Sequence, residues 1–248
     1  ELFSHLANIG DAKSLAIQSI AWAGRYMPGK AGLWLAKTAL VRSPGLGWRV
    51  LSVSVLAEQL LFLVAGTLIA LITIFSLEPF VLTKISEPLA HASQALSARP
   101  VTITVVLGLT VVAAVCGLPR LLAQGAGEGT ARFAWYQWPL LLIAYAGIHL
   151  IAGVSLYPLI ASLLPEAAAA LGPFGIAGAL ALANVAGIAA FFAPAGLGVR
   201  EAVLAITLTF GVDYDQAFAV AVLLRIVTLF SDALFAVGGL IIGKLSDR

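Results

Sequence analysis

The segment Phe191-Phe192-Ala193-Pro194-Ala195-Gly196-Leu197-Gly198-Val199-Arg200-Glu201 decides the fold of this chain, because it separates two strongly apolar runs. Pro194 lacks an amide donor, and the glycines let other groups approach the main chain closely. At membrane depth such irregular backbone survives only where protein buries it or water fills a cavity beside it. A helix that opens at about Leu197 points its positive N-terminal end, with Arg200 just inside, at this break. The segment therefore predicts a place for an anionic group.

The composition predicts a polytopic membrane protein. Of the 248 residues, 61% are hydrophobic and 10% are charged, whereas soluble domains carry about 25% charged residues. The 14 Lys and Arg against 12 Asp and Glu leave a net charge of +2, which is too balanced to suggest nucleic acid binding. The lone Cys116 excludes an internal disulfide and a cysteine metal cluster, and three scattered histidines add no case for a metal. We expect no metal, no cofactor and a multi-pass position in the cell (plasma or inner) membrane.

Apolar runs outline the helices. Two helical pieces at 14–26 and 31–42 flank Met27-Pro28-Gly29-Lys30, and each is too short for the roughly 20 residues of a membrane span. They form a re-entrant hairpin or one broken crossing. Further along the chain we expect spans at 51–75, 101–118, 139–164 and 216–243, an interfacial helix at 77–98, a short loop before the apolar run 173–192, and a helix at 197–210. Whether 173–192 crosses fully or is re-entrant stays open.

The two breaks have matching surroundings, which predicts an internal repeat. Pro28 and Pro194 are each followed 17 residues later by a turn glycine, and then by one charge in the next apolar helix, Glu58 or Arg225. Three crossings between the copies would turn the second copy upside down, as in alternating-access carriers. We therefore predict one all-α transmembrane domain over 1–248 with an inverted repeat of a broken or re-entrant helix hairpin plus a long transmembrane helix. Repeat 1 covers about 14–75, connecting spans fill 76–172, and repeat 2 covers about 173–243.

Ionisable residues in or beside the spans mark the candidate site, since each costs about 2.5–3.5 kcal/mol at a helix centre. They are Glu58, Arg200, Glu201, Arg225 and Asp232. These groups line a substrate or gating path, or they neutralise one another across helices and only hold the bundle together. Arg225 and Asp232 share a helix face roughly 10 Å apart, so they are not expected to pair directly. Arg25, Lys30 and Lys37 either serve the site or extend to the interface.

Two motifs carry a resemblance to a known family. Gly24-Arg25-Tyr26-Met27-Pro28-Gly29-Lys30 is followed by Glu58 in the next span, and Pro194-Ala195-Gly196-Leu197-Gly198-Val199-Arg200-Glu201 is followed by Arg225 in the last long helix. They resemble the first Pro-Gly motif and the P-G-G-L-G-x-R-E signature of the flippase-like membrane domain of the lysylphosphatidylglycerol synthase family. Ala195 stands where that family usually has glycine. Family members usually carry about two earlier spans, so we expect N-terminal spans to be missing here.

The resemblance implies a lipid translocase, a flippase or scramblase-like carrier that moves a charged or glycosylated phospholipid between leaflets by alternating access. It implies a two-part head-group site: Arg25, Pro28, Gly29, Lys30 and Glu58 in one half, and Pro194, Gly196, Gly198, Arg200, Glu201 and Arg225 in the other. In this reading Arg200, Arg225 and Lys30 meet the head group, while Glu58, Glu201 and Asp232 balance charge or bind a proton.

Expected partners are a phospholipid or glycolipid substrate, the membrane, and a partner synthase or a second copy of the chain in a homodimer. Two alternatives remain: a secondary transporter of a small anion, and a non-catalytic membrane domain that supports a lipid-modifying synthase. An enzyme is disfavoured, because neither break carries paired catalytic carboxylates, a nucleophile–base set or a metal cluster.

Overall fold

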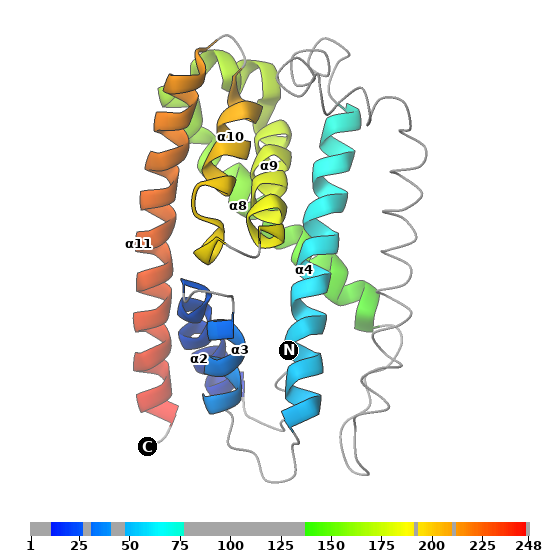
Figure 1. Ribbon diagram of the computed structural model, residues 1–248, viewed down its shortest axis with the longest axis vertical. Helices are drawn as coiled ribbons and strands as arrows, with labels where there is room; N and C mark the ends of the chain where they lie inside the picture. Colours follow the sequence, from blue (N-terminus) through cyan, green and yellow to red (C-terminus); the bar gives the residue numbers. More distant parts are fainter. Residues whose placement is uncertain are drawn as a thin grey trace.

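A computed structural model describes residues 11–26, 31–40, 48–76, 137–190, 193–209 and 212–246, and within these ranges every regular element is a helix. Figure 1 shows their arrangement. In chain order they are α2 (Asp11–Ala23), η1 (Gly24–Tyr26), α3 (Ala31–Leu40), α4 (Trp48–Ser76), α8 (Gln137–Leu163), α9 (Pro165–Ala189), η3 (Pro194–Gly196), α10 (Val199–Leu208) and α11 (Tyr214–Ser246). The interfacial helix expected at 77–98, the span at 101–118 and the residues Pro28, Gly29 and Lys30 lie outside the described residues.

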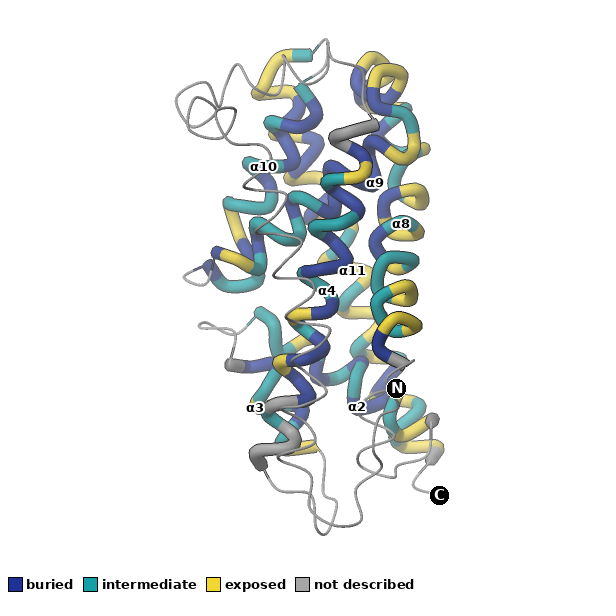
Figure 2. Tube along the Cα trace, turned by 90° about the vertical axis from the view of Figure 1, so that its right-hand side faces the viewer, coloured by how far each residue is buried: buried dark blue, intermediate teal, exposed yellow. Residues whose placement is uncertain are grey.

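Four of these helices, α4, α8, α9 and α11, are long and apolar enough to cross a membrane. The inner helices are α9 and α4, with 56% and 50% of their apolar windows buried, whereas the corresponding share is 17% in α8 and 22% in α11. The outer faces of α8 and α11 expose large apolar side chains such as Ile151, Phe230 and Leu234 (Figure 2). Such an extended apolar surface is suited to lipid rather than to water. The prediction of an all-α multi-pass membrane protein is therefore confirmed.

Two helix pairs, α2 with α3 and α9 with α10, lie beside opposite halves of α11 (Figure 1), and α2 and α10 are the members that pack on it. In the first helix pair, α2 packs along its C-terminal half, where a Cβ atom on Gly239 would lie 2.5 Å from Cβ of Ser19. The second helix pair, α9 and α10, lies beside the N-terminal half. The ends of the two pairs meet near mid-length, where η1 contacts η3. The last helix therefore connects both breaks of the sequence.

A kink at Gly172 divides α9 and corrects the loop expected before residue 173. Residues 165–171 are helical, and Ala167, Ala168 and Leu171 are buried in the core. Gly172 has φ +63°, a conformation that glycine adopts readily, and Pro173 disfavours helical geometry for the residue before it. The 17 residues from 173 to 189 then extend about 25 Å, less than the roughly 30 Å of a hydrocarbon core. They end near the middle of the molecule (Figure 1).

Close packing of α8 on α9 depends on a glycine, which gives a first prediction. A Cβ atom on Gly153 of α8 would lie 2.2 Å from Cα of Ala177 in α9, so Gly153→Ala forces the helices apart. We expect a loss of about 1–3 kcal/mol of stability, measured as a lower melting temperature in detergent. Gly147→Ala in the same helix is the matched control, because a Cβ atom there meets nothing within 4 Å. Equal melting temperatures for both variants would contradict this packing.

Candidate functional site

The break after α9 is a tight turn that folds back onto α9. Ala195, Gly196 and Gly198 have φ values of +51°, +72° and +84°, and this left-handed region favours glycine. A Cβ atom on Gly196 would lie 2.6 Å from Cα of Gly187, so only glycine allows this close approach. Pro194 accepts a hydrogen bond of 3.0 Å from the Leu197 amide, which closes η3. The turn thus presents the start of α10 to the middle of the molecule.

Glu201 closes the first turn of α10. Its Oε2 atom accepts a 2.7 Å hydrogen bond from the amide of Gly198, which satisfies one of the free donors at a helix start. Its other oxygen, Oε1, lies 3.4 Å from Nε of Arg225 in α11. Both side chains are more than nine-tenths buried, and neither of these two atoms has a hydrogen-bond partner. The contact is an ion pair without hydrogen-bond geometry. It leaves the Oε1 atom of Glu201 able to accept a hydrogen bond and the Nε atom of Arg225 able to donate one.

Arg225 also links the two breaks. One terminal nitrogen donates a 3.2 Å hydrogen bond to the carbonyl oxygen of Ala195 in η3. Its Cζ atom lies 5.6 Å from the ring centroid of Tyr26 in η1, within the range of a cation–π contact. A single side chain of α11 therefore contacts residues from both helix pairs.

Asp232 gathers the end of the first helix pair, two turns further along α11. Its carboxylate forms an ion pair with Arg25 and accepts hydrogen bonds from the hydroxyl of Tyr26 and, at 3.0 Å, from Nε1 of Trp22. The guanidinium of Arg25 lies over the rings of Trp22 and Tyr26, 4.5 and 5.1 Å from their centroids. Arg225 and Asp232 do not pair with each other; each binds a residue from a different helix pair.

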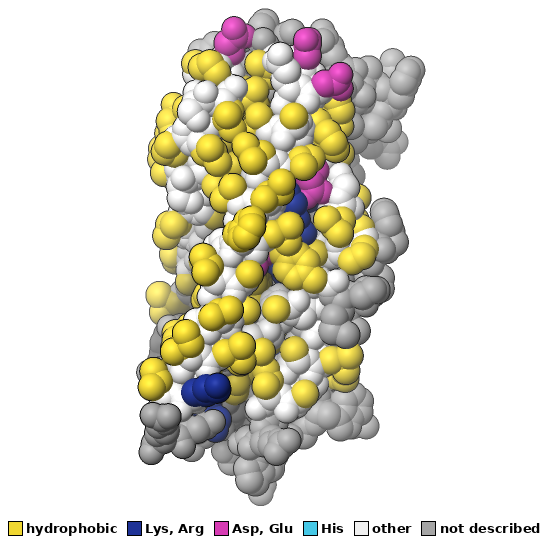
Figure 3. Space-filling model, turned by 90° about the vertical axis from the view of Figure 1, so that its left-hand side faces the viewer, with side chains coloured by type: hydrophobic (Ala, Val, Ile, Leu, Met, Phe, Trp, Pro, Cys, Tyr) yellow, Lys and Arg dark blue, Asp and Glu magenta, His cyan; other side chains and the backbone are white. Residues whose placement is uncertain are grey.

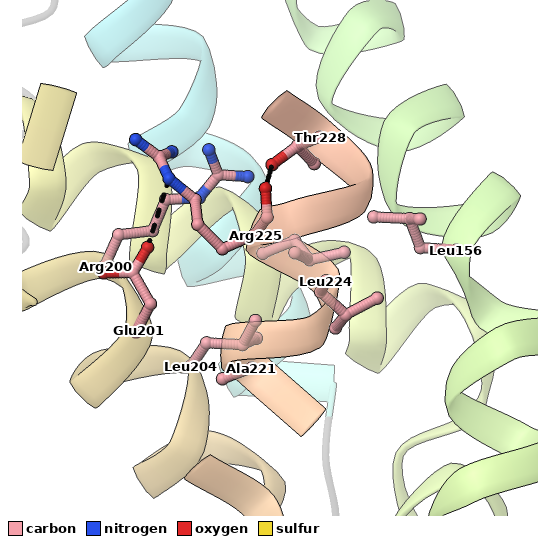
Figure 4. Close-up of a pocket in the computed structure, with 9 residues that line it drawn as sticks. Leu156, Arg200, Glu201, Leu204, Ala221, Leu224, Arg225 and Thr228 are labelled. Carbon is pink, nitrogen blue, oxygen red and sulfur yellow. Dashed lines mark hydrogen bonds and ion pairs between the residues drawn. The ribbon is translucent and has the colours of Figure 1, made fainter. Parts of the chain in front are cut away.

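Arg200 lies beside Arg225 without a partner of its own. Figure 4 shows both guanidinium groups next to each other on one side of a small cavity, with Leu156, Leu204 and Leu224 around the rest. Among the described residues, no hydrogen bond or ion pair engages the Arg200 side chain. Its guanidinium group interacts electrostatically, without direct contact, with Arg25, Arg225, Glu201 and Asp232. The cavity volume of about 10 Å³ leaves room for about one water molecule. The site is therefore cationic, and its cavity is small.

A second buried ion pair, between Lys37 of α3 and Glu58 of α4, lies apart from these arginines. The side chains are 1% and 8% exposed, so Lys37 does not extend to the interface, and that interpretation is wrong for this residue. Neither side chain lines the cavity beside Arg200 and Arg225. Glu58 thus neutralises Lys37 rather than a residue of the other break.

The structure brings most of the expected residues to one place. Arg25, Arg200, Glu201, Arg225 and Asp232 lie around η1 and η3, with Pro194, Gly196 and Gly198 forming the turn between α9 and α10. The sequence reasoning missed Trp22, Tyr26 and the carbonyl group of Ala195. Tyr26 and Ala195 stand inside the two quoted motifs, and that position was the available signal. Within the described residues, no group of three or more His, Cys, Asp or Glu side chains could hold a metal ion.

Charge is visible at mid-height on an otherwise hydrophobic face. Figure 3 shows basic and acidic side chains between yellow apolar ones there, acidic side chains at one end and basic side chains at the other. The charges at the two ends agree with the positions of the residues in the helices: Glu166 and Asp215 begin α9 and α11, and Lys244 lies in the last turn of α11.

Comparisons of the chain with models of protein families, with curated proteins and with solved structures find no match.

Proposed function

We propose that this chain is a lipid translocase that moves a phosphate-bearing head group between the leaflets of a membrane. One observation carries the proposal: the charged cluster at mid-length holds more positive than negative charge. Arg25, Arg200 and Arg225 face two carboxylates, Glu201 and Asp232, among the described residues. A partly buried charge without a partner is costly, so the cluster favours an anion beside Arg200. Arginine is well suited to phosphate, because its fork of donors matches the phosphate oxygens.

The surroundings of the cluster support a lipid rather than a soluble ligand. The charged side chains at mid-height are visible from the side of the molecule that carries exposed apolar residues of α11 (Figure 3). A head group could enter there from the bilayer while its acyl chains stay in lipid. The arginines would replace the water that the head group loses at membrane depth.

Several features of the fold support an inverted repeat with two re-entrant pairs. A glycine crossing closes each pair: a Cβ atom on Gly24 would lie 2.5 Å from the oxygen of Gly32, and Gly196 lies against Gly187. The second helix of each pair also forms a buried ion pair with the long helix that follows. These are Lys37 with Glu58 in the first copy and Glu201 with Arg225 in the second, with the charges exchanged. Pairs that enter from opposite faces fit alternating access.

The small cavity fits one state of such a cycle. A head group needs far more than the space of one water molecule, so α2 and α3 would have to separate from η3 on one side for it to enter.

The positive-inside rule places the end with Lys244 in the cytoplasm and the end with Glu166 and Asp215 outside. The resemblance to the flippase-like domain of the lysylphosphatidylglycerol synthase family adds to this proposal.

The purified chain in liposomes tests the proposal. Liposomes that contain an acyl-labelled phosphatidylglycerol are treated with albumin, which extracts label from the outer leaflet only. With the protein we expect the extractable fraction to rise from about half to nearly all, because label from the inner leaflet crosses. Liposomes without protein, or with an unrelated helical membrane protein, are the control. Transfer no faster than in the control would reject the proposal and would favour a membrane domain that only supports a partner synthase.

The small cavity favours one rival, a secondary transporter of a small anion. A small inorganic anion requires less enlargement of this cavity than a lipid head group does, and the two adjacent arginines suit an anion. Its signature is uptake of radiolabelled phosphate into the same liposomes under a proton gradient, without movement of the labelled lipid.

A further inference from the structure

Glu201 lies where it would face the head group, and the proposed transfer leaves its position unexplained. Its Oε2 atom is held by the Gly198 amide, so the carboxylate cannot turn away without losing that bond. Its Oε1 atom is buried and has no hydrogen-bond partner among the described residues, and Glu201 lines the same cavity as Arg200 and Arg225. A fixed negative charge inside an anion site reduces the affinity for the anion. A site that served only to bind phosphate strongly would not keep it.

The net charge of the described cluster indicates a role for Glu201. Three arginines against Glu201 and Asp232 leave one positive charge. A ligand with one negative charge neutralises the cluster completely. A ligand with two negative charges leaves one in excess, close to the Glu201 oxygen that lacks a donor. Like charges placed together in a buried contact are strongly unfavourable.

We propose that Glu201 restricts this site to head groups with a single negative charge, so that the substrates are phosphodiesters and not phosphomonoesters. The inference rests on the proposed lipid transfer. A phosphodiester has one negative charge at any ordinary pH. A phosphomonoester has a second pKa near 6, so it carries close to two charges above neutral pH and one below it.

The wild-type chain provides the first test, which needs no substitution. Transfer of acyl-labelled phosphatidylglycerol, a diester, is compared with that of acyl-labelled phosphatidic acid, a monoester, at pH 8 and pH 5.5, after subtraction of protein-free rates. At pH 8 we expect the diester to move at least about tenfold faster. At pH 5.5 the ratio should fall towards one, because the monoester then has one charge. Equal rates at pH 8 would overturn the inference and leave the lipid transfer standing; no transfer of either lipid would reject the transfer itself.

Glu201→Gln provides the second test. The amide oxygen of glutamine still accepts the Gly198 hydrogen bond, while the cluster gains one positive charge. At pH 8 we expect the preference for the diester to fall from about tenfold to less than about threefold. Glu166→Gln, an exposed acid at the end of the molecule, is the matched control and should keep the wild-type ratio. A folded Glu201→Gln protein with the full preference would contradict the role of Glu201.

Discussion

Replacing Arg200 with alanine is expected to abolish lipid transfer while the protein remains folded. Arg200 is the cation of the central cluster that no carboxylate neutralises among the described residues, so its removal leaves no buried acid without a partner. Its Cβ atom faces Gly187, and alanine keeps that atom. Loss of a buried charged contact to the head group should reduce the transfer rate on the order of a hundredfold. The melting temperature should stay within the 2–4 °C that about 1 kcal/mol produces in a chain of this size.

Arg225→Ala is the informative comparison, because the two arginines lie side by side and differ in their partners. Its removal leaves the carboxylate of Glu201 buried and the carbonyl oxygen of Ala195 without its donor. We expect transfer to be lost together with about 3–5 kcal/mol of stability. Lys244→Ala, at an exposed position in the last turn of α11, should change neither. Wild-type transfer by a folded Arg200→Ala protein would exclude Arg200 from the head-group site.

The sequence is sufficient to predict where helices begin and end near the second break. Pro194 and the glycines at 196 and 198 interrupt the chain where η3 separates α9 from α10, and Glu201 stands at the third position of the new helix. These are local effects, in which each residue acts on its own backbone. The kink at Gly172 is equally local. Residues 165–171 are helical and do not form the expected loop, because the four alanines at 167–170 favour a helix.

The partners of the buried charges could not be predicted from the sequence. Asp232 pairs with Arg25 across 207 positions of the chain, and this contact depends on how α2 packs along α11. The helical repeat correctly places Arg225 and Asp232 on one face without specifying what lies opposite. Lys37 is the clearest case. A lysine near the end of a short apolar helix could equally reach the interface or form a buried ion pair. Its burial follows from the position of Glu58 in α4.

Breaking the Lys37–Glu58 pair is expected to reduce stability as much as Arg225→Ala does. Removing one partner, as in Lys37→Met or Glu58→Leu, breaks this buried ion pair. We expect each single variant to lose about 3–5 kcal/mol, which corresponds to a melting temperature lower by roughly 6–20 °C at 2–4 °C per kcal/mol. Melting followed by tryptophan fluorescence in detergent measures the change. Single variants that melt at the wild-type temperature would show that the pair contributes nothing to the fold.

The double variant Lys37→Met with Glu58→Leu separates stability from function. An apolar pair of similar volume can replace a buried ion pair without loss, so we expect the melting temperature to recover to within a few degrees of wild type. We also expect lipid transfer to recover, because neither side chain lines the cavity beside Arg200 and Arg225. The resemblance to the lipid translocases places Glu58 in the head-group site instead. A double variant that is stable but inactive would support that placement, and the charge exchange between the two copies would then belong to the transport path rather than to the packing of the bundle.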